Sequence, residues 1–482
     1  MVSTTLVREA CLVDGAWRAA ADGRVFDVTD PATGGRIASV PLMAEADTEA
    51  AVAAAEAALR PWRKRTAKDR AAVLTRWAHL MTEHAEELAE LLTTEQGKPL
   101  AEARGEINYA ISFLTFYAAE GQRVRGELIP ATSEDSRIMV LRQPIGVVGC
   151  ITPWNFPAAM ITRKAAPALA AGCTVVLKPA EQTPLSALAI AELGQRAGLP
   201  AGVLNVITGD APAIGRTLCA SPAVRLISFT GSTEVGKLLS AQCADTVKRL
   251  TLELGGNAPF LVFEDADLDA AVTAAVLSKY RHSGQTCVCT NRFLVQESIV
   301  GEFTDRFAAA VGKLAVGDGR QSGVDVGPLI DADGLAKVAA HVEDAVAKGA
   351  RLLVGGGPHA LGGTFFQPTV LADVTPRMRV MREETFGPVA AISSFDTEES
   401  AVALANDTHT GLAGYFFTRD LGRAWRVAEA LEVGMVGLNT GFLSVEVAPF
   451  GGVKESGLGR EGSHHGIEDF LETKFVHIGG LG

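Results

Sequence analysis

Two cysteines separated by one valine, Cys287 and Cys289, lie in the stretch SGQTCVCTNR, and His282 directly precedes it. Residues of these types could form a metal site, a disulfide, or a nucleophilic thiol with a second thiol beside it. A metal site would need further clustered ligands, and the seven cysteines include no C-x-x-C pair. We therefore expect Cys287 to be either a nucleophile on a turn between a helix and a strand or a buried thiol.

A candidate general base lies in the stretch RLTLELGG. Alternation along this predicted strand puts three leucines on one face and Glu253 on the other. Catalytic groups of open α/β sheets gather at the carboxyl ends of strands, and a partly buried carboxyl has a raised pKa. Glu253 is thus either a proton acceptor or a solvated carboxylate at a strand edge.

A candidate oxyanion donor is Asn155 in TPWNFP, where two prolines restrict the backbone. A rigidly held amide is a suitable hydrogen-bond donor, and one such donor is worth about 3–4 kcal/mol of transition-state stabilisation. The alternative is an asparagine that only caps a turn.

Two further stretches are typical of nucleotide binding. ISFTGSTEVG delivers Gly231 and Ser232 from a predicted strand into a helix, whose N-terminal amides suit a phosphate. VVLKPAEQTP places Lys178 and Glu181 just after a buried strand, where both could contact ribose hydroxyls. A carboxylate at Glu181 would also repel a 2′-phosphate. The alternative for the first stretch is that its glycines only form the turn between the strand and the helix.

The elements that must position these residues alternate between strand and helix. Residues 44–118 predict about three helices, and short apolar strands then alternate with helices, which indicates a doubly wound, mostly parallel sheet. A second α/β unit begins near residue 257. Strand-like segments at 121–142 and in FLETKFVHIG fit neither unit, and we expect them to pair with another subunit in a homo-oligomer.

Composition excludes some functions. The formal net charge of −12, without a basic run, argues against nucleic acid and anionic membranes as partners. The N-terminus lacks the pattern of a secretory signal, and the longest apolar run, 165–177, is too short and too interrupted to span a bilayer. The expectation is a cytoplasmic protein that acts on a small molecule.

Seven motifs in register give the chain a resemblance to the aldehyde dehydrogenase superfamily over nearly its full length. They are TPWNFP (152–157), KPAEQTP (178–184), FTGSTEVG (229–236), LELGG (252–256), GQTC (284–287), EETFGP (383–388) and PFGGVKESGLGREG (449–462). The resemblance implies an α/β fold with a Rossmann-type cofactor domain, an α/β catalytic domain and a β oligomerisation arm. The expected boundaries are 1–122 and 143–255 for the cofactor domain, 256–448 for the catalytic domain, and 123–142 and 465–482 for the arm.

The same resemblance implies roles for individual residues. Cys287 would add to the aldehyde carbon, Asn155 and the Cys287 backbone N–H would hold the oxyanion, and Glu253 would activate the water that hydrolyses the thioester. A hydride would pass to NAD, or to NADP, and Glu181 favours NAD. No metal is expected. The cofactor contacts carried over are Trp154, Lys178, Glu181, Gly231, Ser232, Glu384, which would hold the nicotinamide ribose, and Phe386.

Arg163 and Arg281 lie close in sequence to Asn155 and Cys287, and arginines suit capture of a carboxylate. The strings around them, with Ser444 in FLSVEVAPFGG, resemble the succinate-semialdehyde dehydrogenase branch of the family. This resemblance implies that the two arginines and Ser444 hold a distal carboxylate on the substrate, and it implies a place in γ-aminobutyrate degradation. For the substrate, glutarate semialdehyde and general aliphatic aldehydes remain alternatives. For the two arginines, the alternative is ion pairing at the surface. For the reaction class, the alternative is a cysteine hydrolase. The branch often has Phe-Arg-Asn where this chain has Tyr-Arg-His.

Cys289 could close a disulfide with Cys287 under oxidation, since a C-x-C spacing in an extended turn falls near the permitted separation. A passive neighbouring thiol is the alternative. The resemblance also implies a homodimer or homotetramer.

Overall fold

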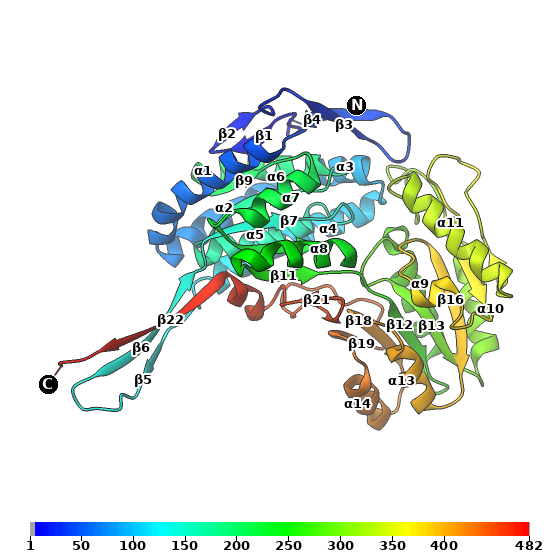
Figure 1. Ribbon diagram of the computed structural model, residues 1–482. Coiled ribbons are helices and arrows are strands. Elements are labelled where there is room, and N and C mark those ends of the chain that lie inside the picture. The colour runs from blue at the N-terminus through cyan, green and yellow to red at the C-terminus, as the bar shows by residue number, and fades with distance from the viewer. Residues whose placement is uncertain (1–4, 482) are drawn as a thin grey trace.

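Two open α/β sheets and a projecting β arm make up the chain in the computed structural model, which describes residues 5–481 (Figure 1). The first sheet has the order β2-β1-β9-β8-β7-β10-β11-β21. Its strands from β9 to β11 run parallel, whereas β1 and β21 join antiparallel at either side. The bounds are β1 (Cys11–Val13), β2 (Ala16–Arg18), β7 (Val147–Ile151), β8 (Thr174–Lys178), β9 (Leu204–Val206), β10 (Val224–Thr230), β11 (Arg249–Glu253) and β21 (Gly457–Leu458).

Helices cover both faces of this sheet, which confirms the predicted doubly wound arrangement. One apolar core contains side chains of α2 to α6, and the other contains side chains of α1, α7 and α8. The bounds are α1 (Glu45–Lys64), α2 (Ala67–Glu83), α3 (Ala85–Gln96), α4 (Leu100–Glu120), α5 (Ala159–Ala171), α6 (Pro184–Arg196), α7 (Ala211–Ala220) and α8 (Thr233–Cys243).

The helical segment at the start of the chain is more divided than the sequence predicted. Four helices, α1 to α4, replace the expected three, because His84, whose φ and ψ of −104° and 17° are not helical, separates α2 from α3. Gly97 ends α3 in the left-handed conformation that favours glycine at this position.

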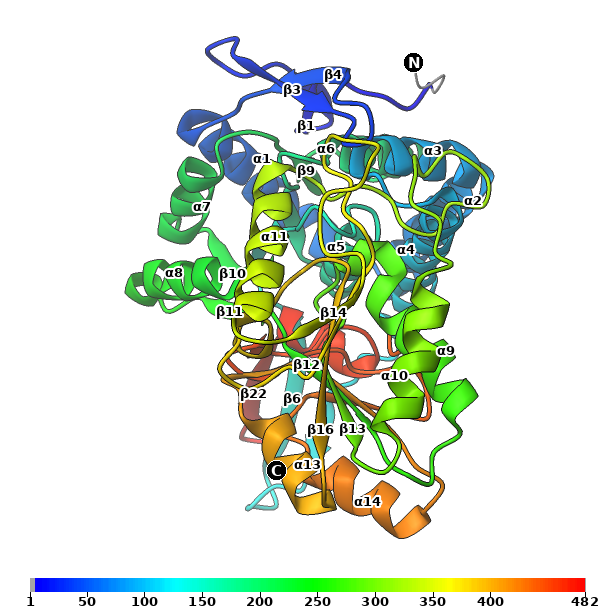
Figure 2. The same cartoon turned by 90° about the vertical axis from the view of Figure 1, so that its right-hand side faces the viewer.

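The second sheet has the order β14-β15-β16-β13-β12-β18-β19, with only β14 antiparallel among the described strands of this sheet. Its strands are β12 (Ala258–Val262), β13 (Thr290–Gln296), β14 (Arg351–Val354), β15 (Thr369–Ala372), β16 (Val389–Phe395), β18 (Ala413–Phe417) and β19 (Met435–Leu438). Its helices are α9 (Leu268–Tyr280), α10 (Val300–Val311), α11 (Ala332–Ala347), α12 (Arg379–Arg382), α13 (Glu398–Asn406) and α14 (Leu421–Ala430). Figure 2 shows α11 on the side of this unit that faces α7 and α8.

The arm is a separate ribbon of β5 (Glu127–Ile129), β6 (Arg137–Pro144) and β22 (Leu471–Ile478), and it projects from the body in Figure 1. Strand β22 pairs antiparallel with β6 from Leu471 opposite Pro144 to Ile478 opposite Arg137. The two strand-like segments therefore pair with each other, which the sequence did not predict. Their pairing with a second subunit stays a prediction.

Short elements complete the described chain. The sequence did not predict the N-terminal strands, whose few residues carry little periodicity. These N-terminal strands include β3 (Val25–Thr29) and β4 (Arg36–Pro41), which pair with each other. The other short elements are β17 (Thr410–Gly411), β20 (Val453–Lys454), η1 (Ala244–Thr246), η2 (Arg281–Gly284) and η3 (His464–Phe470).

Within residues 5–481, no helix has the length and apolar character needed to cross a membrane.

Candidate active site

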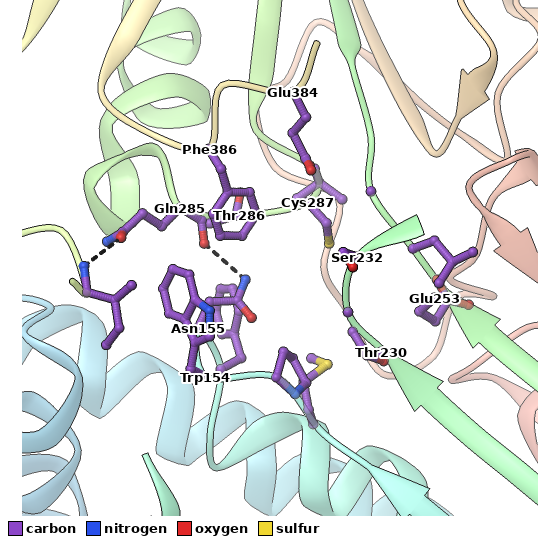
Figure 3. A pocket seen from close by; sticks show the side chains of 18 of the residues that line it. Trp154, Asn155, Thr230, Ser232, Glu253, Gln285, Thr286, Cys287, Glu384 and Phe386 are labelled. Atoms are coloured by element: carbon purple, nitrogen blue, oxygen red, sulfur yellow. Dashed lines mark hydrogen bonds between the residues drawn. The ribbon is translucent and has the colours of Figure 1, made fainter. Parts of the chain in front are cut away.

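A cavity of about 370 Å³ lies where the carboxyl ends of β7, β10 and β11 meet loops of the second sheet (Figure 3). This position agrees with the rule that open α/β sheets bind ligands beyond the carboxyl ends of their strands. Most of its lining is apolar or aromatic. Predicted site residues that line it are Trp154, Asn155, Arg163, Gly231, Ser232, Glu253, Cys287, Glu384, Phe386 and Ser444.

Cys287 reaches this cavity through a tight turn after α9. The helix ends at Tyr280 because Arg281 is extended, with ψ of 134°, and His282 and Ser283 then adopt left-handed conformations with φ of 61° and 55°. Gly284 follows with φ of +72°, and a Cβ there would lie 2.2 Å from the carbonyl oxygen of Gly387. The turn thus needs glycine, and it sets the path of the chain toward Cys287.

The Cys287 thiol is protonated at neutral pH in this environment. Burial, together with the carboxylates of Glu384 and Glu253 and against the opposing charge of Arg163, raises its pKa to about 12. Nucleophilic attack therefore requires that a nearby group, or a change of charge in the cavity, remove the proton.

Glu253 ends β11 and carries the features of a buried proton acceptor. Its side chain is 3% exposed, and neither carboxyl oxygen has a hydrogen-bond partner in residues 5–481. Burial, followed by the charge of Glu461, raises its pKa well above the usual value, while Arg163 and Lys164 act in the opposite direction. The leucines of β11 pack into the core below it, as the alternation predicted.

Asn155 is held at both ends of its residue. Its Nδ2 donates to the carbonyl oxygen of Gln285 at 3.0 Å, and its own carbonyl oxygen accepts from Lys98 Nζ at 2.8 Å. Lys98 is itself fixed by a buried ion pair with Glu106. An amide nitrogen carries two hydrogens, so the second remains for an oxygen in the cavity. Figure 3 shows Asn155 and Cys287 on the same cavity, with the bond to Gln285 dashed.

Groups suited to a nucleotide lie on one flank of the cavity. Ser232 caps α8 by accepting from the Val235 N–H at 3.3 Å, so the first turn of that helix points its amides toward the cavity flank. Glu384 accepts from the Gly256 N–H at 3.0 Å, and a Cβ on Gly255 would lie 2.9 Å from the same carboxylate. Because Gly255 has no Cβ, the Glu384 carboxylate stays open to a ligand. This carboxylate suits the ribose of a dinucleotide, and the amides of α8 suit its phosphate.

Lys178 and Glu181 form an ion pair of 2.5 Å at the end of β8. Lys178 Nζ also donates to the Pro179 carbonyl oxygen at 3.1 Å. The pair lies outside the residues that line the cavity, and Glu181 is 40% exposed. Both charges of this pair are thus largely satisfied within the chain.

Aromatic rings narrow the cavity next to Cys287. Trp154 and Phe386 meet edge to face, with ring centroids 5.4 Å apart and an interplanar angle of 85°. Phe386 has a left-handed φ of 54°, which places its side chain at this position. A flat ring could pack against this pair.

The three predicted substrate residues are only partly brought together. Ser444 and Arg163 line the cavity, whereas Arg281 is not among the lining residues. Arg163 is 2% exposed, so it is no surface ion pair, and its Nε lies 2.5 Å from Glu461 Oε2. Its guanidinium also lies 3.8 Å from the centroid of the Phe450 ring.

Arg281 lies beside the cavity wall instead. Its guanidinium is 5.0 Å from the Phe442 ring centroid and 6.0 Å from that of Phe156. Its charge also lowers the pKa of Glu102, although burial dominates and raises that pKa to about 7.

Cys289 and His282 lie outside the cavity. Cys289 is 5% exposed, and its sulfur accepts from Lys279 Nζ at 3.3 Å. The His282 ring stacks on Phe156 at 4.8 Å, and its backbone N–H donates to Glu102 Oε2 at 2.8 Å. The histidine therefore packs behind the loop that carries Asn155.

Glu461 is the residue that sequence reasoning missed. It accepts from Lys164 Nζ at 2.6 Å, pairs with Arg163, and raises the pKa of Glu253. It lies within the last of the seven motifs, but its position far along the chain gave no hint of these partners. Within the described residues, no group of three His, Cys, Asp or Glu side chains could hold a metal ion.

Comparison with known proteins gives the class. A family model described as the aldehyde dehydrogenase family matches residues 17–476, and the chain belongs to this family. It is an aldehyde dehydrogenase, with the α/β fold that the resemblance implied.

Three relatives are similar over almost the whole chain. A glutarate-semialdehyde dehydrogenase of Pseudomonas aeruginosa is 58% identical over 476 residues, which cover 99% of each chain. A succinate-semialdehyde dehydrogenase [NADP(+)] of Escherichia coli is 57% identical, again with 99% of each chain covered. The crystal structure of a succinate-semialdehyde dehydrogenase from Burkholderia pseudomallei is 58% identical and matches with a TM-score of 0.98, covering 99% of each chain.

Proposed function

We propose that this aldehyde dehydrogenase oxidises succinate semialdehyde to succinate with NAD(P) as the hydride acceptor. The observation that carries the proposal is a buried arginine in the cavity of the candidate nucleophile. Arg163 Nη2 is buried and has no hydrogen-bond partner in residues 5–481, although the side chain pairs with Glu461 through Nε. A buried cationic donor without a partner is costly, and a substrate carboxylate would satisfy it.

The chain's own residues would act in sequence. Cys287 adds its sulfur to the aldehyde carbon, and the oxyanion accepts from the free Asn155 hydrogen and from the Cys287 backbone N–H. NAD(P) held at α8 and Glu384 supplies the hydride acceptor. Glu253 then removes a proton from water, which hydrolyses the thioester to the acid. Buried, with a raised pKa and both oxygens unpartnered, Glu253 is suited to this step.

The alternatives differ by chain length and by class. Glutarate semialdehyde has one further methylene, which a pocket discriminates only about 10–200-fold, and a relative of that name is as similar as one named for succinate semialdehyde. A cysteine hydrolase would need a histidine base beside Cys287, but His282 stacks on Phe156 behind the loop. Oxidation that requires added nicotinamide separates the two classes.

A substrate panel tests the proposal. We expect the highest kcat/KM for succinate semialdehyde over glutarate semialdehyde and over neutral aldehydes of equal length. Replacement of Arg163 by Met should raise KM for the acid-bearing aldehydes far more than for neutral ones. Arg281→Ala is the comparison, because Arg281 does not line the cavity. We expect it also to raise KM for the acid-bearing aldehydes, but by less than the Arg163 variant. Equal effects on charged and neutral substrates in both variants would remove the carboxylate role.

For the cofactor, we propose that NAD is preferred and that NADP is used less well. The Lys178–Glu181 pair supports this, because Lys178 is already neutralised by Glu181, whose carboxylate would repel a 2′-phosphate. Glu181→Ser should raise kcat/KM with NADP by about tenfold, equivalent to about 1.4 kcal/mol. Glu56→Ser, an exposed residue of α1, is the control for loss of charge. A wild-type preference for NADP would contradict the proposal.

The Cys287–Cys289 disulfide stays a proposal as well. In this structure the Cys289 sulfur contacts Lys279 and not the cavity, so closing the bond requires the chain between the two cysteines to turn. We expect peroxide to inactivate the enzyme and a thiol reductant to restore it. If Cys289→Ala loses and regains activity just as the wild type does, this redox role fails.

We also propose a homodimer or homotetramer assembled through the arm, a cytoplasmic location and a role in γ-aminobutyrate degradation. Exposed apolar side chains on the arm support the first: Leu128 is 72% exposed and Phe475 is 62% exposed. Cell fractionation and growth of a deletion strain on γ-aminobutyrate test the other two.

A further inference from the structure

Two buried thiols take no part in the proposed reaction and lie side by side in the first α/β unit. Cys219 lies in the last turn of α7, and Cys243 is the last residue of α8. Each is 1% exposed, and both belong to the same apolar core. Figure 2 shows α7 and α8 as neighbours at the edge of the molecule.

The contact between the two helix ends can be followed in the packing of their elements. Helix α7 packs against α8, and η1, which directly follows Cys243, packs against both helices. The hydroxyl of Thr246 lies 3.4 Å from the Cys219 carbonyl oxygen and 3.3 Å from that of Cys243, so both backbones converge on one atom. The two cysteines therefore lie on helix ends that meet in one core, so a bond between their sulfurs needs only local movement of these ends.

A lysine provides positive charge next to this pair. Lys248 Nζ is fixed by the carbonyl oxygens of Ser221 at 2.5 Å and Val224 at 2.9 Å, and its charge lowers the pKa of both thiols. The main cause that lowers the pKa of Cys243 is its interaction with Cys219, whereas the interaction with Cys243 and burial raise the pKa of Cys219. Cys243 is therefore the side chain that forms a thiolate more readily, with Cys219 as its proton-bearing partner.

The two helix ends lie just below the surface. Ala220 and Gln242 flank the cysteines, and Ala244 and Asp245, which directly follow Cys243, are exposed. A small oxidant such as hydrogen peroxide therefore has a short path to the sulfurs, whereas a large reagent does not.

We propose that Cys219 and Cys243 form a reversible disulfide that cross-links α7 to α8 when the protein meets a peroxide. The Cys243 thiolate attacks one oxygen of hydrogen peroxide and becomes a sulfenic acid, with release of hydroxide. The Cys219 sulfur then attacks the Cys243 sulfur, and water leaves with the Cys219 proton. Two thiols and one peroxide give one disulfide and two waters, and a dithiol reductant reverses the reaction.

The other thiols of the first unit lack these features. Burial raises the pKa of Cys150 to about 12 and the pKa values of Cys11 and Cys173 to about 11, and none of the three has another cysteine as a hydrogen-bond partner. Oxidation should therefore select the Cys219–Cys243 pair within this unit. The proposal is independent of the proposed function, because the pair lies outside the cavity of Cys287.

Peptide mapping tests the proposal directly. Trypsin would release Cys219 in peptide 217–225, Cys243 in peptide 238–248, and both Cys287 and Cys289 in peptide 282–292. After brief exposure of the native full-length protein to peroxide, alkylation and non-reducing digestion, we expect a species that joins 217–225 to 238–248. A dithiol reductant should return both peptides to their alkylated single forms.

Matched variants sharpen the result. Cys243→Ser and Cys219→Ser should each abolish the linked species, and Cys150→Ser should leave it unchanged. The oxidised wild type should also melt at a higher temperature than the reduced form, because a cross-link lowers the entropy of the unfolded chain, and Cys219→Ser should lack this increase. The proposal is overturned if both peptides stay alkylatable after peptide 282–292 has been oxidised. Separate sulfinic acids, or a link to any third cysteine, also overturn it.

Discussion

At the scale of single residues, charge in a closed cavity governs the chemistry. Burial raises the pKa of Cys287 to about 12, so the reaction must remove the thiol proton, and burial also raises the pKa of Glu253, which makes this carboxylate a stronger base. Glu461 links the proposed substrate site to the proposed base, since it pairs with Arg163 and at the same time raises the pKa of Glu253. The proposed substrate site and the proposed base therefore share one buried carboxylate.

Removal of the Glu253 carboxylate should stop hydrolysis of the thioester while leaving its formation possible. We expect Glu253→Gln to lower kcat by about 10²–10⁴-fold, the usual contribution of a general base. Rapid-quench measurements should show up to one equivalent of reduced cofactor per site, followed by little turnover. Glu90→Gln, an exposed glutamate of α3, is the control. Full turnover by Glu253→Gln would assign the base elsewhere.

The pH profile should carry the signature of these raised pKa values. Activity requires Cys287 and Glu253 without their protons, so kcat/KM should rise as the pH increases from neutral into the alkaline range. Glu461→Gln removes a negative charge that raises the Glu253 pKa, so the acid limb of the profile should move to lower pH. A shift to higher pH would contradict this electrostatic coupling.

Stability of the Glu461 variant needs its own measurement. Breaking a buried ion pair costs about 3–5 kcal/mol, here because Arg163 and Lys164 would lose their partner. Urea unfolding should show this loss, and the pH profile should be recorded where the variant is still folded.

At the scale of elements, glycine turns bring the ends of strands and helices together at the cavity. Gly284 follows two left-handed residues and leaves no room for a side chain against Gly387. Gly256 similarly lets β12 begin beside Cys287, since a Cβ there would lie 2.5 Å from the Cys287 carbonyl oxygen. The position of the sulfur thus depends on backbone contacts that side chains could not replace.

Gly284→Ala should destabilise the fold and reduce activity. Its φ of +72° and the 2.2 Å approach to Gly387 predict a loss of about 1–3 kcal/mol, the usual cost of a strained backbone position. Gly301→Ala in α10 is the matched control, because nothing lies within 4 Å of its added Cβ. Alanine there should be neutral or stabilise by up to about 1 kcal/mol. Equal urea midpoints for the two variants would contradict the strain argument.

At the scale of the whole molecule, the arm is the feature that a single chain leaves least covered. All three residues of β5 are exposed, and β22 presents Phe475 to solvent. Apolar side chains on a projecting ribbon indicate a protein partner, and a second copy of the chain is the proposed one.

Charged substitutions on the arm should separate the subunits. We expect the double variant Leu128→Lys and Phe475→Lys to scatter light as a smaller species than the wild type at micromolar concentration. Val247→Lys is the control, because Val247 is 89% exposed but lies on the body of the molecule. Monomeric wild-type protein, or an unchanged mass in the double variant, would contradict assembly through the arm.

The sequence by itself determined the helical character of residues 44–118, the alternation of strands and helices that follows, the seven motifs and the candidate residues, because periodicity and motif spacing are local properties. Alternation placed Glu253 on the face opposite the leucines of its strand, but it left open whether that carboxylate is buried or solvated. The break at His84 was missed, because its dihedral angles depend on packing.

Only the tertiary structure decided which residues meet. Glu461 reaches Arg163 and Lys164 from almost 300 positions away along the chain, at separations that no local pattern encodes. It likewise placed Arg163 on the cavity and Arg281 behind its wall, and brought Cys219 against Cys243. Contacts between distant segments arise from the packing of helices on sheets, and side-chain charge and burial follow from that packing.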